Sequence, residues 1–339
     1  MNDATPSKSA RSPLAAALRA PEWSLLLGIV MTLGLIYGLD AQGNFFTLRT
    51  QKNLIHYVAL FGVLSIGAAV VIICGGIDLS VGSIVALASV VSAKMVTDWL
   101  PGAVATGGGG TLSPGVVAAA YALTLLMGLL IGFLHAFLIN QLRLPPFIAT
   151  LATMAGLRSV AILVSENKSV TVPFHTFRVF GSDPWYTVPL FLAVAVATSV
   201  MMGWTVLGRH LYALGGNEAA ARLSGLRTMR LKTVAYGLSG MLAALAGILF
   251  AGKSGQGQAT MGVAYELYAI TAAVVGGCSL AGGVGSIRGT VLGLILIQIV
   301  IKGTGIVVTS VDSTQIEGLV LGTVVVLAVA FNQRVRGRA

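Results

Sequence analysis

The sequence predicts an all-α polytopic membrane protein that crosses the bilayer about ten times. Its 339 residues are 56% hydrophobic and only 9% charged, and the mean hydropathy is +0.90. Soluble domains usually carry about 25% charged residues, so this chain lacks the polar side chains that would cover a globule in water. Its apolar residues also fall in blocks of about 17 to 25 residues, the length that spans a bilayer.

The block at 54–74, LIHYVALFGVLSIGAAVVIIC, shows this pattern clearly. As a helix it would be about 31 Å long, which matches the hydrocarbon core. Comparable blocks predict spans at 23–39, 54–74, 79–97, 115–139, 146–164, 187–206, 233–251, 265–280, 289–307 and 315–332. The segment 265–288 is rich in glycine, so it is either a full span or a partly re-entrant one.

The basic residues indicate the topology. The first apolar block is too long for a signal-peptide core and no small-residue cleavage site follows it, which predicts an uncleaved span after a cytoplasmic tail at 1–22. An even number of spans places the tail at 333–339 on the same side of the membrane. Most of the 21 basic residues then lie in cytoplasmic segments, as the positive-inside rule expects. The net charge of +10 therefore reflects topology and gives no indication of a nucleic-acid partner.

A single transmembrane domain is expected at 23–332, with three longer loops. The loops at 98–114 and 165–186 are predicted on the outer side, and the most basic loop, 207–232, on the cytoplasmic side. Cys74 and Cys278 lie in apolar contexts without metal-ligand spacing, so we expect neither a disulfide framework nor a metal site.

The stretch CGGIDLSVGS at 74–83 interrupts the apolar pattern. Gly75 and Gly76 break a helix, and Asp78 or Ser80 can cap the amides of the next one. An ionised carboxylate at the bilayer centre costs about 2.5 to 3.5 kcal/mol, so it needs a reason to be there. We favour a helix boundary near the cytoplasmic face over direct substrate contact. The two interpretations are compatible, because broken helices often line transport pathways.

The loop GRHLYALGGNEAAARLSGL at 208–226 predicts a short cytoplasmic helix. Asn217 can cap its N-terminus, Glu218 suits the positive end of the helix dipole, and Gly225 provides a stop. A solvated basic connector is the alternative. Two caps around a run of small residues instead favour docking into a groove of another protein.

Other candidate sites are weaker. Gly247–Ser254 fits the P-loop pattern G-x-x-x-x-G-K-S, but it ends an apolar helix and lies on the outer side, so we reject a nucleotide site. Arg158 and Glu266 are ionisable residues within spans, which suggests function. Alternatively, Arg158 extends to the outer interface and Glu266 lies there. No combination of nucleophile, base and acid predicts an active site or a cofactor of the chain's own.

Three motifs together resemble one family. GGIDLSVGS at 75–83, ALGGNEAAARLSGL at 213–226 and YELYAITAAVVGGCSLAGGVGSIRGT at 265–290 are similar to the permease subunits of bacterial ABC importers for ribose, xylose and related monosaccharides. These subunits form part of the branched-chain amino acid/ribose permease family. The match runs in order from about residue 54 to residue 332.

The resemblance implies an ABC importer permease fold in the bacterial inner membrane, with both termini cytoplasmic. The chain would form a homodimer, or a heterodimer with a related permease, in contact with membrane lipid. A cytoplasmic ATPase would use ATP and Mg, and a periplasmic binding protein would deliver a monosaccharide or related polyol.

The resemblance also assigns residues to two roles. The helix that couples to the ATPase would comprise Gly215, Gly216, Asn217, Glu218, Ala219, Ala220, Ser224 and Gly225. The translocation pathway and helix break would comprise Gly75, Gly76, Asp78, Ser80, Ser83, Arg158, Glu266 and Tyr268. Many relatives carry an acidic residue where this chain has Tyr268, so sugar preference would differ if that position faces the pathway.

An ion-coupled secondary transporter of a small polar solute is the alternative function. It needs coupling-ion ligands near the midplane of the bilayer, and the sequence offers only Asp78, Glu266 and Arg158. The sequence leaves the identity of the sugar open.

Overall fold

The structure is a computed structural model that describes residues 21–100, 112–308, 317–324 and 326. In this part of the chain, eight helices are long and apolar enough to cross a membrane. They are α2 (Pro21–Leu39), α3 (Leu48–Ile73), α4 (Val81–Lys94) with its π-helical end η1 (Met95–Trp99), α5 (Pro114–Asn140), α6 (Pro146–Ser165), α8 (Pro184–Trp204), α11 (Thr228–Ser254) and α13 (Ile287–Val307).

Shorter elements connect these helices. They are the strands β1 (Val170–Thr171) and β2 (Gln256–Gly257), and the helices α7 (His175–Ser182), α9 (Val206–Gly216), α10 (Glu218–Leu223) and α12 (Tyr265–Val275). The two strands form an antiparallel pair, with Val170 opposite Gly257.

Two of the predicted spans differ from the eight long helices. The segment 265–280 is not a full helical span, because α12 has 11 residues and would extend about 16 Å. It ends at Gly276, and Gly277 follows with a φ of +91°, a conformation that glycine adopts readily. In the span predicted at 315–332, residues 317–324 are helical, and most of the remainder lies outside the described residues. An all-α multi-span fold is confirmed, with eight of the predicted spans found as full-length helices.

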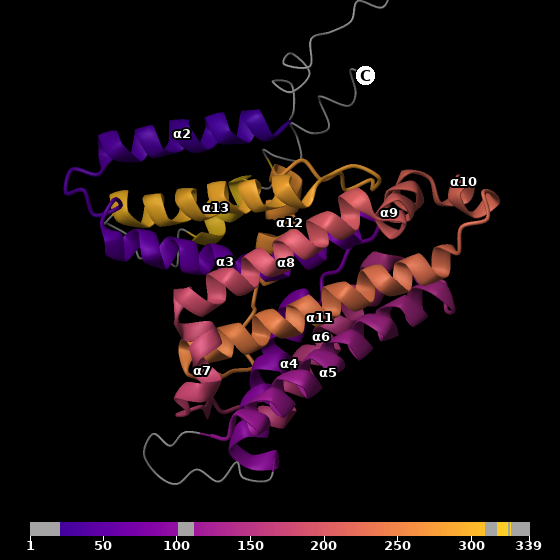
Figure 1. Ribbon diagram of the computed structural model, residues 1–339, viewed down its shortest axis with the longest axis horizontal. Helices are drawn as coiled ribbons and strands as arrows, with labels where there is room; N and C mark the ends of the chain where they lie inside the picture. The colour runs from indigo at the N-terminus through magenta and orange to yellow at the C-terminus, as the bar shows by residue number, and fades with distance from the viewer. Residues whose placement is uncertain (1–20, 101–111, 309–316, 325, 327–339) are drawn as a thin grey trace, which may run out of the picture.

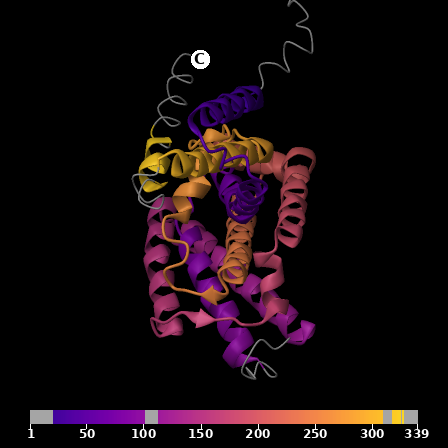
Figure 2. The same ribbon diagram turned by 90° about the vertical axis from the view of Figure 1, so that its left-hand side faces the viewer.

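The long helices form a bundle with two distinct ends (Figure 1). The first, here the α10 end, carries α9, α10 and the starts of α6 and α11. The second, here the α7 end, carries α7 and η1. A view at right angles shows α3 inside the bundle, with other helices around it (Figure 2).

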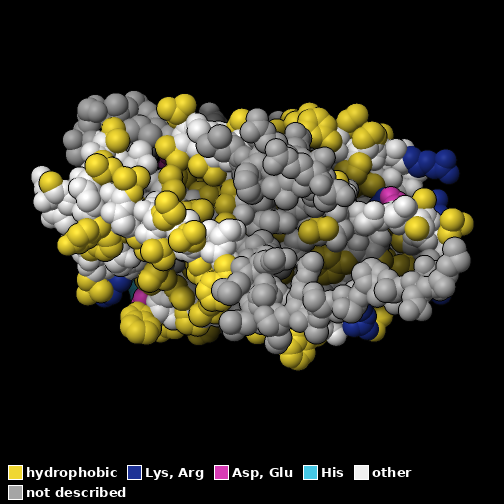
Figure 3. Space-filling view, turned by 90° about the horizontal axis from the view of Figure 1, so that it is seen from above, with side chains coloured by type: hydrophobic (Ala, Val, Ile, Leu, Met, Phe, Trp, Pro, Cys, Tyr) yellow, Lys and Arg dark blue, Asp and Glu magenta, His cyan; other side chains and the backbone are white. Residues whose placement is uncertain are grey.

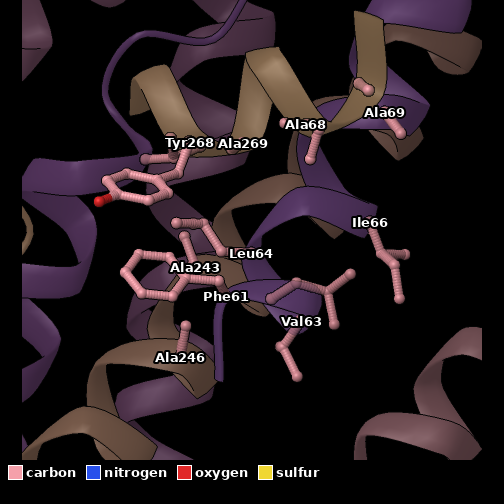
Figure 4. Packing of buried hydrophobic residues seen from close by; sticks show 14 of the residues in the cluster. Phe61, Val63, Leu64, Ile66, Ala68, Ala69, Ala243, Ala246, Tyr268 and Ala269 are labelled. Carbon is pink, nitrogen blue, oxygen red and sulfur yellow. The ribbon is translucent and has the colours of Figure 1, made fainter. Parts of the chain in front are cut away.

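Small residues let the helices approach closely. A Cβ added to Gly128 or Gly132 of α5 would collide with the backbone of α11 at Gly240 and Tyr236. These two glycines form a G-x-x-x-G pattern, which supports close helix crossings in membranes. On α3, Ala68 and Ala69 lie among the buried residues near Ala269 of α12 (Figure 4).

The outer surface of the described bundle is largely apolar, as a bilayer requires. Figure 3 shows apolar side chains over much of the face seen from above, with Lys and Arg side chains near the two ends. In the most apolar 18-residue stretch of α6, only 17% is buried within the chain, compared with 89% in the corresponding stretch of α3. Helix α3 is therefore the centre of the fold, while α6 leaves most of its apolar surface uncovered.

Candidate functional site

The three motifs singled out in the sequence meet at the α10 end. Their contact is formed by Gly75, Gly215, Gly216, Gly282 and Gly283, which we call the glycine junction. The amide of Gly283 donates to the carbonyl of Ile73 at 2.9 Å. A Cβ on Gly282 would lie 2.6 Å from Gly215 O and 2.7 Å from Gly75 Cα. The end of α3, the end of α9 and the loop after α12 are therefore joined backbone to backbone.

Tyr212 of α9 reinforces this junction. Its hydroxyl donates to the carbonyl of Gly285 at 2.9 Å. Burial, followed by the nearby Cys278 thiol, raises the pKa of Tyr212, so the hydroxyl stays a neutral donor. Movement of α9 would therefore be transmitted directly to the loop that follows α12.

Helix α10 follows the junction, with both predicted caps in place. The Asn217 side chain accepts a hydrogen bond from the amide of Ala220 at 2.9 Å. Gly225 has a φ of +82°, and the amide of Leu226 donates to Ala221 O at 3.1 Å, the pattern of a glycine C-terminal stop. Glu218 ties α10 to the first turn of α11 through Lys232, whose Nζ lies 2.8 Å from Oε1. The capped helix predicted from the sequence is confirmed.

The outward face of α10 is small and apolar. Ala219, Ala220 and Ser224 are exposed, and Leu223 is 89% exposed. Residues three or four apart share one face of a helix, so Leu223 lies on the same face as both alanines. The sequence analysis missed Leu223, although its spacing from the two alanines was a usable signal. Leu223 and the two alanines therefore form a small exposed apolar face at the end of the bundle.

Asp78 lies in an unwound stretch between α3 and α4, and it is only 2% exposed. Its Oδ1 accepts hydrogen bonds from the amide and the hydroxyl of Ser80, at 3.0 and 2.6 Å. Its Oδ2 accepts from the Ser239 hydroxyl of α11 at 2.9 Å. The carboxylate therefore holds the start of α4 against α11.

Of the two caps predicted for α4, Asp78 or Ser80, it is Asp78 that accepts an amide at the start of the helix, that of Ser80. Ser80 occupies the N-cap position, but its backbone is already helical, with φ −81° and ψ −9°, and its hydroxyl makes no cap bond. A capping side chain needs the extended backbone that turns its oxygen toward the next amides. Ser83 bonds to the carbonyl of Ser80 at 2.7 Å, so both serines stabilise the turn around Asp78.

Side chains from neighbouring helices bond to two more groups of this stretch. The carbonyl of Ile77 accepts from Thr150 of α6 at 3.3 Å and from Tyr236 of α11 at 3.4 Å. His135 of α5 places Nε2 3.3 Å from the Ser80 hydroxyl and 2.8 Å from Thr153. Backbone groups in a membrane protein need such partners wherever a helix is interrupted.

Replacing Asp78 separates the role of its oxygens from the role of its charge. Asp78→Leu leaves the Ser80 amide and the two serine hydroxyls without an acceptor. Each group left unsatisfied lowers the free energy of unfolding by about 1–3 kcal/mol. Asp78→Asn keeps one acceptor oxygen, so we expect it to retain most folded yield and transport. Both are measured by size-exclusion yield and solute uptake. Equal loss in the two variants would mean that the charge itself is required.

A second interruption lies between α11 and α12, at 255–264. Arg158 of α6 donates from Nη1 to the carbonyls of Ala259 and Met261, at 2.8 and 2.6 Å. Ser89 of α4 bonds to both the amide and the carbonyl of Gln258 at 3.2 Å. From the sequence, Arg158 was expected either to have a function within the span or to extend to the outer interface of the membrane. The structure gives it a third role, as a clamp on this segment.

The start of α4 touches the second interruption. A Cβ on Gly82 would collide with the carbonyl of Gly262 and with the Glu266 carboxylate, and a Cβ on Gly262 would collide with Gly82 O. Glu266 is half-buried, and its Oε2 has no hydrogen-bond partner among the described residues. The start of α4 and the start of α12 thus meet inside the bundle beside one unpaired carboxylate oxygen.

Tyr268 lies in the core of the chain at 5% exposure. Its ring stacks on Phe61 of α3, with a centroid distance of 4.6 Å and an interplanar angle of 22°, and Figure 4 shows the two rings together. The other pathway residues gather around the two interruptions.

Removing the guanidinium of Arg158 is expected to loosen the second interruption. Arg158→Leu deletes two charge-assisted hydrogen bonds, each worth about 1.5–3 kcal/mol. Arg158→Lys keeps the charge but loses the fixed planar donor geometry, so its effect should be smaller. Thermal unfolding in detergent measures both variants. A transition for Arg158→Leu that matches the unmodified protein would contradict the clamp.

Comparison with known proteins identifies the family. Residues 51–329 match the family described as "Branched-chain amino acid transport system / permease component". The chain belongs to this permease family. The resemblance drawn from the three motifs is confirmed, and the chain is a multi-pass inner-membrane permease subunit.

Several relatives of this permease are transport permeases, and some are named for a sugar. The ribose import permease protein RbsC of Escherichia coli K12 is 34% identical over 321 residues, which is 92% of this chain and 94% of the relative. The inner membrane ABC transporter permease protein YjfF of the same strain is 37% identical, covering 78% of each chain. The L-arabinose transport system permease protein AraH is 33% identical, covering 75% of this chain and 74% of the relative. No solved structure matches the chain.

Proposed function

We propose that the permease carries a monosaccharide or related polyol across the bacterial inner membrane, using ATP hydrolysed by a partner subunit. The observation that carries this proposal is α10, a capped helix that exposes Leu223 at one end of the bundle. The substrate class rests on the relatives, whose names specify ribose and arabinose.

The α10 end is the cytoplasmic end in this proposal. The connection between α8 and α11 carries Arg209, Arg222 and Arg227, and the start of α11 adds Arg230 and Lys232. Basic residues favour the cytoplasmic side of a membrane. Both termini, with the tails at 1–22 and 333–339, would lie on that side, and α7 would face the periplasm.

Three partners complete the transporter. A cytoplasmic ATPase binds ATP and Mg and receives α10, and a periplasmic binding protein delivers the sugar at the α7 end. The exposed apolar surface of α6 supports pairing with a second copy or with a related permease, and membrane lipid covers the remaining apolar surface.

Helix α10 would then act as the coupling element. Rotation of the ATPase domains moves Leu223 and α10, and Glu218 passes the movement to α11 through Lys232. The glycine junction passes it to the end of α3 and the loop after α12. Both interruptions, at 75–80 and 255–264, are adjacent to helices that move.

Ion-driven transport is the alternative, and the site chemistry disfavours it. Asp78 already accepts three hydrogen bonds, and Arg158 is committed to two carbonyls. Among the residues predicted for the pathway, one Glu266 oxygen and the Tyr268 hydroxyl have no hydrogen-bond partner within the described chain. One carboxylate oxygen and one hydroxyl are a poor match to the ligand sets that coordinate Na⁺ in such transporters.

Reconstitution tests the function. The permease, its ATPase and its binding protein are placed in liposomes, and uptake of labelled ribose, arabinose, xylose, galactose and inositol is measured. We expect ATP-dependent accumulation of at least one of them. Accumulation of a branched-chain amino acid in place of every sugar would contradict the substrate class.

A further inference from the structure

A cavity at the α7 end has the chemistry of a sugar-binding site. It has a volume of about 520 Å³ and lies between α3, α11 and the segment 255–264. Small-molecule sites in proteins usually measure about 300–1,000 Å³. Its walls include Tyr57, Phe250, Lys253, Gln258, Thr260 and Tyr265, none of which the sequence analysis had selected.

Aromatic rings form one wall of the cavity. Phe250 and Tyr265 lie with their ring centroids 4.9 Å apart, and Phe61 packs behind both of them at 5.2 and 4.7 Å. Interlocked rings of this kind are held rigidly. The faces of aromatic rings carry partial negative charge, so they attract the polarised C–H groups on the apolar face of a sugar ring.

A fixed ammonium group forms a polar part of the lining. Lys253 Nζ lies 3.2 Å from His56 Nδ1 and 4.7 Å from the centroid of the Tyr57 ring. His56 Nε2 lies 2.8 Å from the carbonyl of Gly181, to which it donates, so Nδ1 is left to accept from Lys253. An ammonium has three donors, so Lys253 retains donors for a ligand after it bonds to His56.

The lining of the cavity suits a ring that carries many hydroxyls. No carboxylate forms part of the lining among the described residues, and Lys253 is its charged side chain. Gln258, Thr260 and Ser254 add neutral groups that donate and accept hydrogen bonds. Aromatic rings combined with several hydrogen-bonding groups match a ring that carries many hydroxyls.

The cavity is accessible and lies next to the second interruption. Val263, in the segment that forms one wall, is 60% exposed, and Thr260 is also exposed. The same segment is clamped by Arg158 at Ala259 and Met261. A ligand in the cavity would touch a segment whose far end begins α12 and leads to the glycine junction.

We infer that this cavity is an outer recognition site where the permease itself binds a neutral monosaccharide or a polyol of similar size. The inference rests on the proposed function and adds to it, because it gives the permease a binding step after release from the periplasmic protein. Ligand binding at 255–264 would contact the part of the chain that α10 moves.

Binding to the permease alone tests the site. Purified permease in lipid nanodiscs, without its partners, is titrated with ribose, arabinose and a sugar acid, and contact is detected by saturation-transfer NMR. The variants are Lys253→Met, Tyr265→Leu and Thr260→Trp, which fills the cavity from an exposed position. Lys168→Met is the matched control, since its side chain is 78% exposed at the same end and outside the cavity. Tyr265→Phe keeps the ring.

Unmodified permease should bind a neutral sugar, and the first three variants should lose roughly tenfold in affinity. Lys168→Met and Tyr265→Phe should bind as the unmodified protein does. Unchanged binding in Thr260→Trp, or a preference for the sugar acid, would overturn the inference. If the complete transporter imports a sugar while Lys253→Met and Thr260→Trp transport it normally, the site is wrong and the function stands. If the permease binds sugar here but the complete transporter imports none, the function is wrong and the site stands.

Discussion

Leu223→Glu is expected to abolish ATP-driven uptake while the permease still folds and inserts. Leu223 is 89% exposed, so the substitution removes no packing within the chain and should leave thermal unfolding unchanged. If Leu223 fills a pocket on the ATPase, Leu223→Glu would place a charged carboxylate in that apolar pocket and weaken binding of the ATPase. Central anchors of this kind contribute about 2 kcal/mol or more to binding, which corresponds to a loss of roughly 30-fold or greater.

The measurement is uptake by the reconstituted transporter, together with recovery of the ATPase on the immobilised permease. Leu223→Met is the matched control, since it conserves volume and apolar character and should retain uptake. Normal ATP-driven uptake by Leu223→Glu would rule out α10 as the docking element.

The second large effect is expected from a single methyl group at the glycine junction. A Cβ on Gly215 would collide with the carbonyl of Ile73 and lie 2.6 Å from the amide nitrogen of Gly283. Gly215→Ala should therefore force the end of α9 away from α3 and from the loop after α12. Overpacking of this kind typically costs about 1–3 kcal/mol, and transport should fall further because the connection to α10 is displaced.

Gly216→Ala provides a closely matched control. Gly216 is the next residue, and an added Cβ there would meet nothing within 4 Å. Alanine is favoured over glycine in helices, so Gly216→Ala should be neutral or slightly stabilising. Thermal unfolding and uptake are compared for the two variants. Equal behaviour would show that the junction is not a close-packed connection.

Local features of the fold could be predicted from the sequence. Apolar blocks of bilayer length predicted the long helices, because few structures other than a helix satisfy all backbone groups in lipid. The caps at Asn217 and Gly225 were also predictable, since a cap depends on residues within one helical turn.

Features that depend on distant contacts could not be predicted. Arg158 binds carbonyls about a hundred residues away in the chain, at Ala259 and Met261, and nothing in its own neighbourhood indicates this. Ser80 looked like a cap, but Asp78 draws its hydroxyl away. The short length of α12 follows from the packing of Gly276 against Gly289, where an added Cβ would collide with the backbone.

The cavity at the α7 end is the clearest example of this limit. Tyr57, Lys253 and Tyr265 belong to three separate elements, and each lies in an apolar stretch that predicts only a helix. The fold brings them together, and the contact between His56 and Lys253 then orients the ammonium.

The source of energy is tested most directly with the purified permease alone. It is placed in liposomes with an imposed proton or sodium gradient, and then with its ATPase, its binding protein and ATP. We predict no sugar accumulation under either gradient, and accumulation only when the ATPase can reach α10 and hydrolyse ATP. Gradient-driven accumulation by the permease without the ATPase would contradict the account.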